Sequence, residues 1–224
     1  MTTKRTFSVV LWLTLVSWAK GGTARADSFV PLAQVGGENP VLKIRVLNYS
    51  GSTNGGMWVE VNNPSKTEQK FVADGIFFVP AGDPDKAPQR LGAAGPFQEI
   101  REGKAAPHTQ QVTVSPGETK RLALEVFCSD AHRGSPSSST QFSVAKERLP
   151  KELRQEIRKG NDSILGANGG DVGKSKGAIQ SNMWKERDKK WIKLEGERKI
   201  EKSSPPPRDL NRTPRIQQQQ SEPR

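Results

Sequence analysis

The sequence predicts an α+β protein in which an antiparallel β-sandwich is followed by two helices and a basic tail. Short alternating segments joined by glycine and proline turns occupy residues 41–130, and this pattern is typical of a sandwich. Apolar residues at helical spacing follow from residue 146 onward. Hydrophobic residues make up only 33% of the 224 residues, so we expect part of the chain to stay outside any packed core.

Five segments of the first half have the alternation of apolar and polar residues that marks a half-buried strand. Leu42, Ile44 and Val46, for example, alternate with basic residues. The predicted strands are 41–48, 57–62, 71–79, 110–114 and 121–128. Gly75 marks a bulge or a break between two strands inside the third segment. Residues 80–96 are rich in Gly, Pro and Asp, and we expect them to form a long loop.

The turns between these strands follow a recognisable order. An Asn-Pro turn at residues 63–64 ends the second strand, and a Pro-Gly turn at residues 116–117 precedes the last one. Over residues 41–130 this order resembles the immunoglobulin-like modules of exported bacterial proteins. The resemblance implies an immunoglobulin-like β-sandwich, which we assign to a domain of residues 27–145. The Cys-Trp-Cys signature of immunoglobulin domains is absent.

Two helices are predicted after the sandwich, in a segment of residues 146–202 that packs on it. Leucine and isoleucine recur four residues apart over residues 146–159, which predicts an amphipathic helix ended by Gly160. A second helix is predicted over residues 178–193, where Ile, Met and Trp share one side. The glycine-rich residues 166–177 between them are expected to form a loop.

The first 26 residues have the three parts of a secretory signal peptide. A basic start with Lys4 and Arg5 precedes an apolar run over residues 7–19, and residues 24–26 (Ala-Arg-Ala) provide a cleavage site. The apolar run is shorter than the roughly 20 residues that a membrane-spanning helix needs. We therefore expect residues 1–26 to be removed from a secreted or periplasmic protein, with no transmembrane segment after cleavage.

The formal net charge of +11 comes from the two ends of the chain. Residues 27–142 hold 11 basic and 12 acidic side chains, whereas residues 143–224 hold 20 basic and 12 acidic ones. Prolines and glutamines without apolar periodicity predict a disordered tail over residues 203–224, which offers a contact for an anionic surface. Acids interleave with bases over residues 185–189, as on a solvated helix face, and aromatic residues are scarce. These features argue against a specific nucleic-acid site.

Cys128 is the only cysteine, so it has no partner for a disulfide within the chain. The alternation of the last strand places Cys128 on the apolar face, which favours a buried structural thiol. An intermolecular disulfide and a reactive thiol are the alternatives. Asp130 and His132 follow closely, but they are too few for a zinc site, and a Cys128–His132 pair lacks a third residue to orient it. We expect no metal and no cofactor.

Two short motifs resemble those of the thioester domains of Gram-positive surface proteins. Phe127-Cys128 is similar to the first motif, and residues 179–184 (Ile-Gln-Ser-Asn-Met-Trp) are similar to the second. The resemblance implies an internal thioester between Cys128 and Gln180 that acylates an amine on a target, with Phe127 and Trp184 as supporting residues. Three positions depart from the family pattern: Ser129, Ile179 and Asn182.

The sequence favours a non-catalytic binding or interaction protein, whose partner is an unknown protein or an envelope polymer. A covalent adhesin that uses Cys128 and Gln180 is the first alternative. A thiol-dependent hydrolase that uses Cys128 is the second. Neither a pair of carboxylates nor a nucleophile-elbow pattern supports an enzyme.

Overall fold

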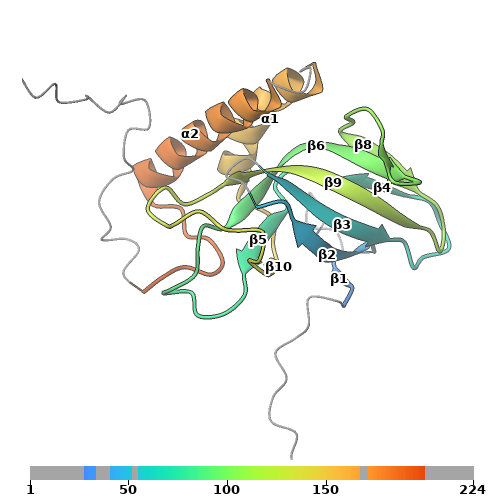
Figure 1. Cartoon of the computed structure of the whole chain (residues 1–224), viewed down its shortest axis with the longest axis horizontal. Helices are drawn as coiled ribbons and strands as arrows, with labels where there is room; N and C mark the ends of the chain where they lie inside the picture. Colours follow the sequence, from blue (N-terminus) through green and yellow to red (C-terminus); the bar gives the residue numbers. More distant parts are fainter. Residues whose placement is uncertain (1–27, 34–40, 52–54, 167–170, 200–224) are drawn as a thin grey trace, which may run out of the picture.

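The computed structural model describes residues 28–33, 41–51, 55–166 and 171–199. The expected signal peptide and the expected tail lie outside these residues and stay predictions. The elements are β1 (Val30–Pro31), β2 (Lys43–Tyr49), β3 (Gly56–Asn62), β4 (Gln69–Val72), β5 (Phe77–Pro80), β6 (Leu91–Arg101), β7 (Lys104–Ala105), β8 (Gln111–Val114), β9 (Thr119–Cys128), β10 (Phe142–Val144), α1 (Lys151–Leu165) and α2 (Val172–Lys190). Figure 1 shows both helices lying across one side of a twisted sheet.

The main sheet is antiparallel throughout, with the order β1-β2-β3-β9-β6-β5-β10 among the described strands. Strand β7 adds to the outer part of β6, and β4 pairs with β8 in a separate two-stranded sheet. Strand β9 is central, because β3 pairs with it from Gly56↔Glu125 to Asn62↔Thr119 and β6 pairs on its other edge. The predicted α+β class with an antiparallel sheet is confirmed.

The main sheet curls until its two edges almost meet. The ring of Tyr49 on β2 packs edge-on against Phe142 on β10, with 5.5 Å between ring centroids. A groove of about 140 Å³ remains between these edges. The immunoglobulin-like sandwich, as one particular arrangement of such strands, stays a prediction.

Apolar side chains form two cores on the two faces of the sheet. The inner core fills the concave face and includes Leu122, Leu124, Val126 and Cys128 of β9. The helix-side core lies between the sheet and the helices, and its members are Phe77, Ala94, Phe127, Ala145, Leu149, Leu153, Ile157, Ile164, Val172, Ile179, Met183 and Leu194. Phe127 lies between two residues of the inner core and faces the other way, as the period of a strand requires.

The sequence prediction for residues 80–96 as a loop is wrong at its C-terminal end, where β6 begins at Leu91. The Gly95-Pro96 pair that suggested a loop is accommodated by an irregularity, because the register with β9 shifts between Ala93 and Phe97. Gly95 has a φ of 114°, which favours glycine. The break at Gly75 is confirmed, since β4 and β5 belong to different sheets.

Both helices extend beyond the predicted bounds at one end. Helix α1 does not end at Gly160 but continues to Leu165. Ile164 extends the row of buried residues that begins with Leu153 and Ile157. Gly160 is required there by packing, because a side chain at this position would clash with Ile179 of α2. Helix α2 already begins at Val172, inside the predicted glycine-rich loop. No helix within the described ranges has the length and apolar character to cross a membrane.

Candidate functional site

Cys128 lies at the end of β9, paired with Leu91 of β6, and is fully buried. Its side chain belongs to the inner core, so the predicted apolar face is confirmed. Burial and the nearby Asp130 carboxylate raise the pKa of the Cys128 thiol to about 12, although the Lys176 ammonium acts in the opposite direction. At neutral pH the group is therefore a neutral thiol, and it resembles a small apolar side chain more than a nucleophile.

Gln180 of α2 reaches the cysteine across 52 residues of sequence. Its Oε1 accepts a 2.9 Å hydrogen bond from the backbone N–H of Cys128. Gln180 is itself only 4% exposed. Because this bond satisfies a buried donor at the end of the strand, the contact ties α2 to β9.

The two supporting residues of the thioester hypothesis belong to different cores. Phe127 packs in the helix-side core, whereas Trp184 reaches the inner core from α2. The indole N–H of Trp184 is buried, and no described residue accepts a hydrogen bond from it. Only Trp184 thus shares a core with Cys128.

His132 follows Cys128 by four residues, in the loop after β9. Its ring lies beside that of Trp191, with 6.3 Å between centroids, while Cys128 faces the inner core. Among the described residues, no group of three or more His, Cys, Asp or Glu side chains is arranged to hold a metal ion.

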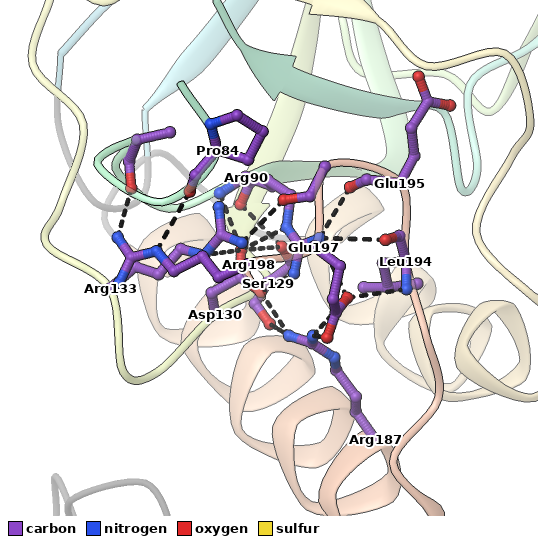
Figure 2. A network of polar contacts seen from close by, with 12 residues as sticks. Pro84, Arg90, Ser129, Asp130, Arg133, Arg187, Leu194, Glu195, Glu197 and Arg198 are labelled. Atoms are coloured by element: carbon purple, nitrogen blue, oxygen red, sulfur yellow. Dashed lines mark hydrogen bonds and ion pairs between the residues drawn. The ribbon is translucent and has the colours of Figure 1, made fainter. Parts of the chain in front are cut away.

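Asp130, two residues after the cysteine, is the centre of a buried ionic network (Figure 2). Arg90 donates to both of its carboxylate oxygens, at 2.9 and 2.5 Å, and Arg187 of α2 forms a second ion pair with it. Burial alone would raise the pKa of Asp130, but the hydrogen bonds and charge of Arg90 and the charge of Arg187 hold it well below its usual range. The carboxylate is therefore ionised inside the protein.

A segment that we call the strap, residues 191–199, closes over this network. The Glu197 carboxylate accepts hydrogen bonds from Arg187 at 3.1 and 3.2 Å. Arg90 donates to the backbone oxygen of Glu195 at 2.7 Å, and Arg198 donates to that of Ala87 at 2.6 Å. Figure 2 shows the strap residues gathered around the arginines. Glu197 of the strap adds a second carboxylate beside Arg90 and Arg187, and the strap fixes the end of α2.

Helix α2 meets β9 through three polar contacts that follow one stripe of the helix. Lys176 pairs with Glu125 at 2.6 Å, Gln180 with the Cys128 backbone, and Arg187 with Asp130. Lys176 is 3% exposed and Arg187 is 2% exposed. Since buried charges are costly unless paired, these contacts specify where the helix sits on the strand.

A wide cleft opens on the other side of α1, at its junction with the sheet. Its volume is about 760 Å³. The lining residues are Val72, Asp74, Gly95, His108, Thr109, Gln110, Gln111, Arg158, Asn161, Asp162 and Leu165. This volume lies within the range of known small-molecule sites, roughly 300–1,000 Å³.

Paired polar side chains form part of the walls of the cleft. Arg158 lies 3.1 Å from the Asp74 carboxylate, and the His108 Nε2 lies 2.8 Å from Glu125. Asn161 is buried at the back. With its amide turned so that the nitrogen faces Ala94, it donates a hydrogen bond to the backbone oxygen of that residue. The cleft is therefore lined largely by polar side chains of α1, of β8 and of the turns beside the strands.

Sequence patterns predict neither the cleft nor the ionic network. The charged stretch at residues 185–189 was expected to be solvated, which is wrong for Arg187. One signal was present, because Arg187 follows Gln180 by seven residues and Met183 by four, and this spacing puts all three on one helix face. The residues that line the cleft come from segments far apart in the sequence, so no local pattern predicts it.

Comparison of the chain with protein-family models, with curated proteins and with solved structures gives no match.

Proposed function

We propose that the protein is an exported, non-catalytic binding protein of the cell envelope or the extracellular space, and that the cleft beside α1 is its binding site. The observation that carries this proposal is the cleft itself, which is large, open and lined mainly by hydrogen-bonding side chains. Export rests on the signal-like sequence of residues 1–26. An immunoglobulin-like arrangement of residues 27–145 would suit a module that presents such a site.

The state of the thiol supports binding over catalysis. A thiol enzyme needs a thiolate within reach of its substrate. Cys128 is fully buried and its pKa is raised to about 12, so it supplies no nucleophile to the surface at neutral pH. The polar residues of the cleft, in contrast, are open to a ligand.

A binding screen with a blocked cleft tests the proposal. The mature chain, residues 27–224, is applied to an array of short peptides and glycans. Leu165 lines the cleft and is 36% exposed, so Leu165→Trp fills the site without disturbing a core. We expect at least one ligand class to be retained by the wild type and lost with Leu165→Trp.

A matched control separates blocking from a general effect of a new tryptophan. Leu47 on β2 has a similar exposure, 38%, and does not line the cleft, so Leu47→Trp should bind like the wild type. Ligands that bind both variants equally well would show that recognition occurs elsewhere, and the proposal would then fail.

A thioester adhesin is the second candidate, and the contact between Cys128 and Gln180 is the observation that favours it. In that reaction the thiol sulfur attacks the carboxamide carbon of Gln180, a C–S bond forms, the C–N bond breaks, and ammonia leaves with the thiol proton. The pKa of about 12 opposes this step, because the reaction needs a thiolate. For this reason we rank the thioester adhesin second.

Intact mass spectrometry distinguishes the two candidates directly. A thioester lowers the mass of the mature chain by one ammonia molecule, and Cys128→Ala abolishes that loss. For a non-catalytic binding protein we expect the unmodified mass of the mature chain. A mass deficit equal to ammonia in the wild type, absent in Cys128→Ala, would establish the adhesin chemistry instead.

A further inference from the structure

We propose that the cleft selects ligands that carry an amine or another compact cationic group, such as the side chain of a lysine in a peptide. This inference rests on the proposed binding function and adds its chemical class. It follows from how the charges of the lining are distributed between two walls. One wall is the last two turns of α1, and the other is formed by residues 72–74 and 108–111.

The basic side chains of the lining each have an acidic partner. Arg158 is paired with Asp74, and His108 is hydrogen-bonded to Glu125. Asp162 differs, because within the described part of the chain its carboxylate forms no recorded hydrogen bond or ion pair, and the residue is exposed. Because the charges of Arg158 and Asp74 offset each other, the Asp162 carboxylate is the negative charge that the described lining offers to a ligand.

The end of α1 adds to this negative potential. The carbonyl groups of the last helical turn carry the negative end of the helix dipole, which attracts cations. Basic residues often occupy such a turn, but the last turn of α1 contains none. Asp162 and Leu165, which line the cleft, lie in this same turn. The carboxylate and the dipole therefore act in the same direction at one wall.

Other ligand classes fit the lining less well. A phosphate or carboxylate would approach the Asp162 carboxylate and be repelled. Sugar rings are commonly held against aromatic side chains, and among the described residues His108 contributes the only aromatic ring of the lining. Val72 and Leu165 supply apolar contacts for a methylene chain that ends in a charged group, as in lysine.

Three peptides of equal length test the class of ligand: acetyl-Gly-Lys-Gly-amide, the same peptide with Gln, and the same peptide with Glu. Their affinities for the mature chain are measured by isothermal titration calorimetry at low salt. We expect the Lys peptide to bind at least about 5-fold more tightly than the Gln peptide, and the Glu peptide most weakly. In Asp162→Asn, the preference for Lys should fall by about the same factor.

Glu152→Gln is the matched control, since Glu152 is an exposed acid on the same helix that does not line the cleft. It should keep the preference of the wild type. Equal affinity for the Lys and Gln peptides, no binding of the Lys peptide, or an unchanged preference in Asp162→Asn would overturn the cationic class. If the array then yields a neutral or acidic ligand that Leu165→Trp abolishes, the proposed binding function survives and only its chemical class is wrong.

Discussion

The side-chain oxygen of Gln180 accepts a 2.9 Å hydrogen bond from the backbone N–H of Cys128, although 52 residues separate the two. One strand end and one helix face are thereby joined inside the protein. Two further contacts, Lys176 with Glu125 and Arg187 with Asp130, lie on either side along the helix. The region around the only cysteine is therefore a polar seam between α2 and β9.

Removing the acceptor of this bond should destabilise the fold. Gln180→Leu leaves the Cys128 N–H buried without its partner, and we expect a loss of about 1–3 kcal/mol in the free energy of unfolding. Urea unfolding measures this loss. Gln155→Leu, an exposed position on α1, is the control and should stay within about 0.5 kcal/mol of the wild type. Equal stabilities of the two variants would contradict the account.

The thiol should be inert in the native protein. Because Cys128 is fully buried and its pKa is about 12, an alkylating reagent at neutral pH should label it only after unfolding. Mass spectrometry of samples labelled with and without urea measures the difference. Rapid labelling of the native chain would mean that the thiol is exposed.

Asp130 should make the stability depend on pH. Its pKa is lowered in the folded state, so its contribution is complete above the unfolded pKa of about 3.9 and is lost as the pH falls toward the folded value. Asp130→Asn leaves Arg90 and Arg187 without this counter-charge, and we expect a loss of about 3–5 kcal/mol at pH 7. The difference between wild type and variant should shrink at pH 2–3. A difference that stays constant from pH 7 to pH 2 would show that folding does not lower the pKa of Asp130.

Two glycines in helix interiors should respond in opposite ways to alanine. Gly177 of α2 has open space around it, so Gly177→Ala should stabilise the protein by up to about 1 kcal/mol. Gly160 of α1 faces Ile179, so Gly160→Ala should destabilise it in spite of the better helix propensity. Thermal unfolding of both variants and of Gly160→Ala with Ile179→Ala tests the contact. Stabilisation by Gly160→Ala alone would show that the helices are not packed this closely.

Much of the β-domain follows from local patterns in the sequence. The alternation along β9 places Leu122, Leu124 and Val126 on one face together with Cys128, and the structure confirms it. The start of β6 was missed because Gly95 and Pro96 normally end a strand, yet here the register shift absorbs them. The extension of α1 through Gly160 was missed because the reason lies in its neighbour, Ile179, and not in the helix itself.

The resemblance to thioester domains predicts that Cys128 and Gln180 lie close together, but it does not predict the kind of contact that the structure shows. No local sequence pattern predicts that the carboxamide oxygen of Gln180 accepts a hydrogen bond from the backbone N–H of Cys128. Arg90, Asp130 and Glu197 come from three separate segments, and their pairing depends on the fold as a whole. The cleft likewise depends on how α1 lies against β6, which sequence periodicity does not determine.

The central claim is that the cleft beside α1 binds a ligand, and chemical-shift mapping tests it most directly. The ¹⁵N-labelled mature chain is titrated with acetyl-Gly-Lys-Gly-amide. The account predicts saturable shifts in the backbone amides of residues 108–111 and 158–165, absent in Leu165→Trp. Shifts confined to residues 203–224 would point to the basic tail as the interaction site, and shifts that Leu165→Trp leaves unchanged would place recognition elsewhere on the surface. Either result would contradict the claim.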